Sequence, residues 1–226
     1  MTTCEVCVEA TPEEPEEPAS EFIASDDFGR TVTGSWGTAD VGGGWTLSGG
    51  AASAASVADG VGKLTLGANS TRNMQLAGVS AKDVTLSVDF SVDTAPTTGA
   101  AYVGVIARAS SADNYTVRSW LHSNGSVWLV VQQGSTVITS YQVPGLTRSA
   151  GDTFTLEVSV SGGTSTTISA KIWKSGTAEP ANWQVTTVDA TGIDAAGAVG
   201  LHANRVSSAT SSTVVSFDAF RVTDNG

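Results

Sequence analysis

Charged residues, prolines, cysteines and histidines are all scarce in this 226-residue sequence, which has six Pro, two Cys and two His. The charged fraction of 15% is well below the roughly 25% of an average globular protein. The helix formers Leu, Lys, Arg, Glu, Gln and Met are also scarce, which argues against a helical bundle. No apolar run approaches the roughly 18 residues of a transmembrane helix, and the acidic N-terminus resembles no signal peptide. We therefore expect no membrane insertion and no cleaved leader.

Basic residues are half as common as acidic ones, 11 against 22, so the net charge is −11. A field of this sign repels nucleic acid, and we expect no nucleic-acid partner. Residues 1–21 hold seven Glu and no Lys or Arg, so they contribute −7 and the other 205 residues only −4. Pro12, Pro15 and Pro18 recur there at a spacing of three. This composition predicts an extended arm over 1–21 ahead of a folded domain over 22–226.

Both cysteines lie in the expected arm, as Cys4 and Cys7. Half of a zinc site is one interpretation, and an intermolecular metal or disulfide link in a homo-oligomer is another. Two reduced thiols are the simpler interpretation. Cys4, Val6 and Val8 alternate with polar residues, which suits addition to the edge of a partner's sheet. We expect the segment Cys4, Val6, Cys7 and Val8 to dock on a scaffold.

From residue 44 onward, short stretches of period-two alternation are separated by turns rich in Gly, Ser, Asn, Asp and Pro. This pattern predicts antiparallel strands and an all-β fold. The expected strands are Trp45–Ser48, Lys63–Leu66, Asn73–Ala77, Val84–Val92, Ala101–Ala109, Tyr115–His122, Ser126–Gln132, Thr136–Val143, Thr153–Ser161, Thr166–Trp173, Gln184–Asp189, Ala198–His202 and Val214–Val222.

One hairpin can be worked out in register, because its turn contains Asn124 and Gly125. A two-residue turn would put the apolar residues of its two strands on opposite faces. A three-residue loop that begins at Ser123, with Gly125 in a left-handed conformation, pairs Leu121 with Val127 and keeps the apolar sets together. We therefore predict the three-residue loop.

The same register places Trp120 opposite Trp128 on the face that points away from the core. The alternation of the preceding strand adds more large side chains to this face. A surface so rich in aromatic residues suits ligand binding, while the alternative is a second small core covered by a loop. The residues expected to share this face with the tryptophans, and to form a glycan site, are Tyr102, Arg108, Arg118 and His122.

The order of several motifs resembles the concanavalin-like, laminin G-like jelly-roll family over nearly all of residues 26–223. The motifs are Asp26-Asp27-Phe28-Gly29-Arg30, Trp36-Gly37, Gly43-Gly44-Trp45, the segment 102–109 followed by Asp113-Asn114-Tyr115, Ile172-Trp173-Lys174, the segment 179–183, the segment 197–201 and Phe217-Asp218-Ala219-Phe220-Arg221-Val222.

The resemblance implies a two-sheet antiparallel jelly-roll sandwich, with about six or seven strands per sheet, one sheet convex and one concave. First and last strands would lie side by side. In similar domains a structural calcium joins these strands, and Asp27 and Asp218 hold the matching positions. Calcium would need six to eight oxygens. The alternative is that Asp218 accepts backbone hydrogen bonds at the strand edge.

Catalytic residues are hard to nominate in this sequence. Glycoside hydrolysis needs two carboxylates flanking the scissile bond, and the folded part has only two Glu, Glu157 and Glu179, in unrelated settings. No nucleophile elbow accompanies His122 or His202, and no phosphate-binding loop is present. We expect a protein that is not an enzyme, although a remote glycosidase remains an alternative.

Domains of the resembled type occur in virion proteins of phages that infect actinobacteria and in secreted glycan-processing proteins. We expect a virion structural protein, either a capsid decoration or a minor tail protein. Its arm would dock on other virion proteins, and its jelly roll would adhere to host cell-surface carbohydrate. The alternative is an extracellular carbohydrate-binding module of a secreted actinobacterial protein.

Overall fold

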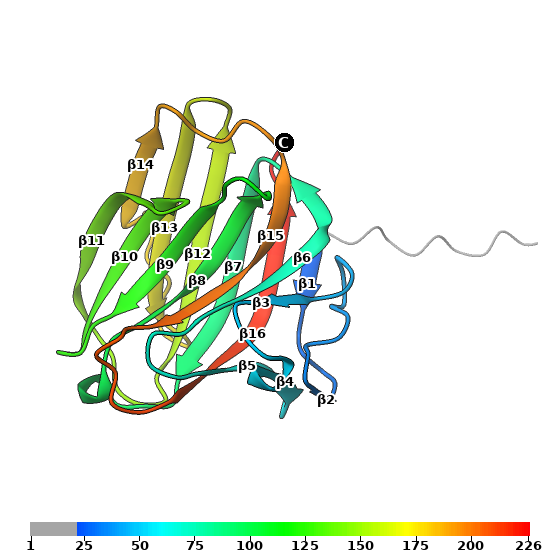
Figure 1. Cartoon of the computed structure of the whole chain (residues 1–226). Coiled ribbons are helices and arrows are strands. Elements are labelled where there is room, and N and C mark those ends of the chain that lie inside the picture. Colours follow the sequence, from blue (N-terminus) through cyan, green and yellow to red (C-terminus); the bar gives the residue numbers. More distant parts are fainter. Residues whose placement is uncertain (1–21) are drawn as a thin grey trace, which may run out of the picture.

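The computed structural model describes residues 22–226, so the expected arm over 1–21, with Cys4, Val6, Cys7 and Val8, lies outside the described residues. Within residues 22–226 the chain forms two antiparallel sheets packed face to face, as expected for a jelly-roll sandwich (Figure 1). The same residues contain two short 3-10 helices, Ala52–Ala54 and Pro96–Thr98. No helix in this part of the chain has the length and apolar character needed to span a bilayer.

The first sheet has seven strands and the second has nine, where the resemblance implied six or seven in each. In spatial order the seven-stranded sheet contains β11 (Thr136–Thr147), β10 (Ser126–Gln133), β9 (Tyr115–Leu121), β8 (Ala101–Ala109), β15 (Gly197–Arg205), β6 (Thr71–Ala81) and β3 (Thr46–Ser48).

The nine-stranded sheet is built in the same antiparallel manner. Its order is β14 (Val185–Asp189), β13 (Thr166–Lys174), β12 (Thr153–Gly162), β7 (Val84–Val92), β16 (Thr213–Asp224), β5 (Val61–Leu66), β4 (Ala55–Ala58) and β2 (Val32–Thr33), with β1 (Ala24–Asp26) paired to β16. The pairing of β1 with β16 confirms that the first and last strands lie side by side. All the strands expected from the alternation are present, while β1, β2 and β4 were missed.

The core lies between the two sheets and is built from alternate residues of each strand, as the period-two pattern requires. In β7 the residues Val84, Leu86, Val88, Phe90 and Val92 are all buried, and the residues between them are partly exposed.

An aromatic cluster fills the end of the core beside β1. Trp36 is fully buried, with its ring centroid 5.2 Å from Phe28 and 5.3 Å from Trp45. The indole Nε1 of Trp45 donates a 2.6 Å hydrogen bond to the buried carboxylate of Asp26, which also pairs with Arg30. The N-terminal motifs that carry the resemblance therefore join the first strands to the core.

Candidate functional site

The hairpin of β9 and β10 has the register predicted from its sequence. Leu121 stands opposite Val127, and Trp120 stands opposite Trp128. The turn is the predicted three-residue loop: Gly125 has a φ of +87°, and its amide donates a 3.0 Å hydrogen bond to the carbonyl of His122. Because a left-handed conformation costs glycine little, the loop keeps both apolar sets on the core side.

A row of rings crosses β8, β9 and β10 on the outer face of the seven-stranded sheet. Tyr102 stands opposite Trp120, and their nearly parallel rings have centroids 5.6 Å apart. The rings of Trp128 and His122 lie 5.8 and 4.8 Å from that of Trp120. All four side chains remain partly exposed, so they do not form a closed second core. We refer to Tyr102, Trp120, Trp128, His122 and Arg118 as the aromatic face.

Arg118 connects the aromatic face to a polar pair on the neighbouring strands. Its guanidinium carbon lies 4.2 Å from the ring centroid of Tyr102, a cation–π contact, and its Nη1 lies 3.3 Å from Nε2 of His202. Since arginine can only donate, Nε2 of His202 is the acceptor and the ring proton is on Nδ1. That Nδ1 donates a 2.8 Å hydrogen bond to Oδ1 of Asn73. His202 is therefore a neutral imidazole with both nitrogens in use.

Burial explains why His202 stays neutral. The side chain is only 7% exposed, and burial is the main cause that lowers its pKa to about 3, with the positive charge of Arg118 adding to the effect. Burial likewise lowers the pKa of Arg118 and raises that of Tyr102.

A glycine makes room for the contact between Arg118 and His202. Gly104 stands between them, paired with Arg118 on β9 and with His202 on β15. A Cβ at this position would lie 2.2 Å from the carbonyl oxygen of Val117 and 2.7 Å from Cβ of Arg118. The missing side chain lets the guanidinium cross the central strand β8.

Several buried polar atoms of this region have no hydrogen-bond partner within residues 22–226. They are Nε of Arg118, Nε1 of Trp120 and Oε1 of Gln132. In the pairing of β9 with β10, Trp120 lies opposite Trp128, Arg118 opposite Val130 and Gln132 opposite Thr116. Trp120, Arg118 and Gln132 therefore lie in three successive rows of one face. Unpartnered buried donors and acceptors cost free energy, which hydroxyl groups of a ligand can offset.

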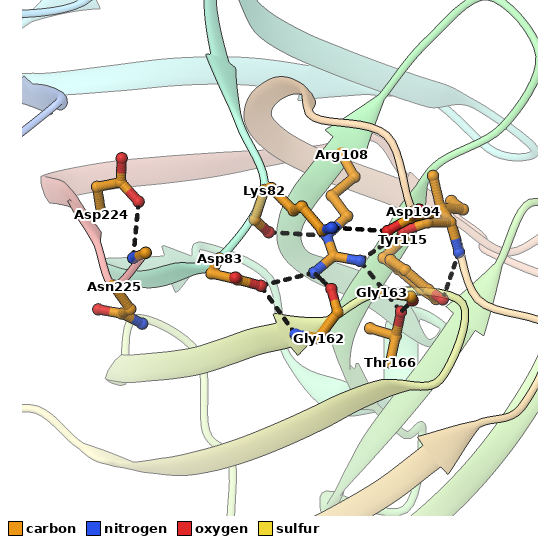
Figure 2. Close-up of polar contacts among 12 residues, drawn as sticks. Lys82, Asp83, Arg108, Tyr115, Gly162, Gly163, Thr166, Asp194, Asp224 and Asn225 are labelled. Carbon is orange, nitrogen blue, oxygen red and sulfur yellow. Dashed lines mark hydrogen bonds and ion pairs between the residues drawn. The ribbon is translucent and has the colours of Figure 1, made fainter.

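Arg108 does not belong to the aromatic face, which corrects the prediction from alternation. Its side chain is 1% exposed and lies at one end of the sandwich (Figure 2). Nε donates to the carbonyl of Lys82 (2.7 Å), and Nη2 donates to Asp83 (3.0 Å) and to the carbonyl of Gly162 (2.9 Å). Nη1 donates to Thr166 Oγ1 and to the carbonyl of Ile193.

A β-bulge causes this displacement. Along β15, Ala198 pairs with Ala109 and Gly200 pairs with Ile106, so one residue on β15 faces two on β8. Arg108 is one of those two and has a φ of +50°. The extra residue breaks the alternation after Ile106. The side chain of Arg108 therefore points toward the end of the core and not to the outer face.

The expected calcium ligands have protein partners. Oδ1 of Asp27 accepts a 2.6 Å hydrogen bond from Arg221, and Oδ1 of Asp218 accepts one of 2.7 Å from the amide of Ala219. Burial and the nearby Asp27 and Asp89 raise the pKa of Asp218. Between residues 22 and 226 no three Asp, Glu, His or Cys side chains gather in a metal-binding arrangement. The hydrogen bond from Ala219 to Asp218 matches the hydrogen-bonding alternative, and the calcium site stays a prediction.

A cavity of about 500 Å³ lies at the other edge of the sandwich, between β11 and β13. It is lined by Trp173, Pro144 and Pro180 among others. Beside it, the ammonium group of Lys171 lies 4.8 Å from the ring centroid of the exposed Trp183. We refer to this region as the edge cavity.

No protein-family model matches the sequence, and no curated protein matches it. Solved structures do match the fold. A pseudo beta-1,3-glucanase and immunostimulatory antigen of Mycobacterium tuberculosis aligns with a TM-score of 0.60 at 10% identity, over 92% of this chain and 100% of its own.

Two further matches are modules of other kinds of protein. The CBM2 module of the evolved Dit protein of Lactobacillus casei phage J-1 has a TM-score of 0.56 at 10% identity, covering 91% of this chain and 96% of that one. The carbohydrate recognition domain of Emp46p has a TM-score of 0.53 at 11% identity, covering 80% and 88%. At these identities the matches establish the jelly-roll sandwich fold that this chain shares with lectin-like and glucanase-like proteins.

Proposed function

We propose that this chain binds carbohydrate on the aromatic face. The observation that carries the proposal is the partly exposed row of Tyr102, Trp120 and Trp128, with ring centroids 5.6 and 5.8 Å apart. The apolar faces of pyranose rings stack on such side chains, while polar groups beside them bond the hydroxyls. The matched structures include a carbohydrate recognition domain and a CBM2 module, which supports this proposal.

Binding without catalysis is the second part of the proposal. The seven strands that carry the aromatic face contain no Asp or Glu, so a carboxylate pair for glycoside hydrolysis cannot come from them. A general base works best with a pKa near the working pH, and His202, with a pKa of about 3, is a weak base whose Nε2 is already engaged. The raised pKa of Tyr102 also disfavours its use as a base. These features support a binding module.

The biological setting we propose is a phage virion, in which residues 1–21 attach the chain to a capsid or tail and the sandwich displays the aromatic face. One of the matched structures is a module of a phage Dit protein, which supports this setting. A secreted carbohydrate-binding module is the alternative. Mass spectrometry of purified particles, compared with the culture medium, distinguishes the two.

The test of binding is a glycan array probed with the wild type, Trp120→Ala and Trp128→Ala. Trp183→Ala is the matched control, because Trp183 is an exposed tryptophan in the loop before β14, away from the aromatic face. We expect each variant of the aromatic face to lose about tenfold or more in affinity, since truncating a central tryptophan costs roughly 2 kcal/mol. The control should bind as the wild type does.

Circular dichroism in the near ultraviolet checks that the variants are folded. If Trp120→Ala does not fold, Trp128→Gln on the neighbouring strand tests the same face. If folded variants of the aromatic face bind glycan as tightly as the wild type, or if Trp183→Ala loses binding, the glycan site does not lie on the aromatic face. A wild type that binds no glycan would refute the proposal.

A further inference from the structure

The two sheets of the sandwich differ in charge. None of the seven strands in the sheet that carries the aromatic face contains Asp or Glu. The strands of the nine-stranded sheet contain six acidic residues, namely Asp26, Asp89, Glu157, Asp189, Asp218 and Asp224. In a chain with 22 acidic and 11 basic residues, a sheet without carboxylates is an unusual local environment.

Arg118 is the cation at the centre of this environment, and it has no anionic partner within residues 22–226. Its contacts are the ring of Tyr102 and the Nε2 atom of His202. Since His202 is neutral, it does not balance the charge. Nε of Arg118 is buried and unpartnered, and burial lowers the pKa of the guanidinium. A partly buried charge without a counter-ion is unfavourable, and buried charges in proteins are normally paired.

The edge cavity shows the usual situation by contrast. Lys171 there also lies beside tryptophans, but its ammonium group pairs with Glu157 at 3.0 Å and with Glu179. That cation is already neutralised. Within residues 22–226 a cation contacts tryptophan or tyrosine rings at these two places, and of the two cations Arg118 is the one without an anionic partner.

The geometry points to an acidic glycan as the ligand: we infer that the saccharide bound on the aromatic face carries an anionic group that pairs with Arg118. This inference rests on the proposed function. Arg118 is two residues from Trp120 along β9, which separates their Cα atoms by about 7 Å. That spacing matches a sugar ring stacked on Trp120 with its exocyclic acid over Arg118. A planar guanidinium binds carboxylate, sulfate and phosphate oxygens through paired hydrogen bonds.

The test compares matched pairs of saccharides, one member with an ionised acidic group and the other with that group esterified or removed. The arms are an oligogalacturonate and its methyl ester, a sulfated oligosaccharide and its desulfated form, and a phosphorylated oligosaccharide and its dephosphorylated form. Each is titrated into the wild type, Arg118→Met, Arg118→Lys and the control Lys171→Met, with tryptophan fluorescence or calorimetry as the readout. The three arms show which kind of acid the site takes.

We expect the wild type to bind the acidic member of at least one pair about tenfold to a hundredfold more tightly than the neutral member, as hydrogen bonds to a charged group require. Arg118→Met should bind both members equally, and Arg118→Lys should keep part of the preference. Lys171→Met should keep all of it. If Arg118→Met does not fold, Arg118→Lys alone tests the inference. Lysine keeps the positive charge but lacks the paired donors of the guanidinium, so the preference for the acidic member should be reduced.

Negative results that overturn the inference are distinguishable from those that refute the proposed function. Binding of neutral members as tightly as acidic ones, with loss of binding in Trp120→Ala, would overturn the inference and leave the proposed function standing. An acidic preference that survives in folded Arg118→Met would also overturn it. No binding of any member by the wild type would refute the proposed function itself.

Discussion

Acid should destabilise the folded protein through His202, because this imidazole is buried and neutral. Its side chain is 7% exposed, Arg118 is the charged group that faces it, and Asn73 accepts from its Nδ1. The folded-state pKa is about 3, whereas an unperturbed histidine has a pKa of about 6.5. Between these values the unfolded chain binds one more proton than the folded one. The free energy of unfolding therefore falls as the pH is lowered through 6.5 toward 3.

The size of this effect follows from the two pKa values. Between pH 7.5 and pH 5.0 the linkage relation gives a loss of about 2 kcal/mol from this one residue. This loss of free energy depends mainly on the pKa of His202 in the unfolded chain, since His202 is almost fully neutral in the folded protein at pH 5.0. Carboxylates with lowered pKa values, such as Asp152, add their own loss at lower pH. The contribution of His202 must therefore be measured as a difference between two proteins.

The perturbation is His202→Gln, whose side-chain oxygen can accept from Arg118 and whose amide can donate to Asn73. Urea unfolding at pH 7.5 and pH 5.0 gives the free energy of unfolding of the wild type and the variant. We expect the wild type to lose about 2 kcal/mol more than His202→Gln over this interval. His122→Gln is the control, because His122 is the other histidine of the sequence and is partly exposed. Equal losses in the wild type and His202→Gln, or a titration of His202 above pH 5 in the folded protein, would refute the reasoning.

Two further substitutions test Arg108, which lies outside the aromatic face, and Gly104, which makes room for Arg118 within it. Arg108→Met should lower the free energy of unfolding in urea by roughly 3 to 5 kcal/mol, because it removes a fully buried guanidinium that pairs with Asp83 and donates to the carbonyls of Lys82, Gly162 and Ile193, while glycan affinity of the folded protein is kept. If Arg108→Met instead loses glycan affinity with its free energy of unfolding unchanged, Arg108 belongs to the glycan site after all. Gly104→Ala should cost about 1 to 3 kcal/mol and weaken glycan binding, since its Cβ would displace Arg118, whereas Gly29→Ala has open space around its Cβ and is the control. Equal stability of the two alanine variants would contradict the close packing at Gly104.

Short-range patterns in the sequence were sufficient to predict most strands and one complete register. The hairpin of β9 and β10 needed only the alternation on each side and the left-handed preference of Gly125. The missed strands β1, β2 and β4 are only two to four residues long, a length at which alternation is a weak signal. The pairing of β1 with β16 came from the family resemblance, since no local pattern encodes contacts between the two ends of a domain.

The error at Arg108 shows how a single residue limits such predictions. Alternation assigns a side chain to a face only while the strand keeps its register, and the bulge opposite Val199 adds one residue to β8. Residues 105–114 contain no Gly or Pro that would signal a bulge at Arg108. The prediction was therefore correct for Tyr102 and wrong six residues later on the same strand.

The polar chain from Arg118 through His202 to Asn73 could not be predicted from local patterns. Asn73 and His202 are 129 residues apart and meet through the pairing of β15 with β6, while the contact of His202 with Arg118 depends on the pairing of β8 with β15 and β9. One signal was available in the sequence: the segments that form the seven-stranded sheet lack Asp and Glu altogether. That absence becomes meaningful only when the topology shows that these segments belong to one sheet.

The charge of the whole chain and the charge of the aromatic face have opposite signs, and they act over different distances. The net charge of −11 repels an acidic saccharide at long range, but salt at 0.15 M screens exposed charges beyond about 8 Å. Arg118 acts only in contact, where partial burial protects the interaction from screening. An acidic glycan should therefore approach without electrostatic steering and be retained after contact. Selectivity at this site then lies in the rate of dissociation more than in the rate of association.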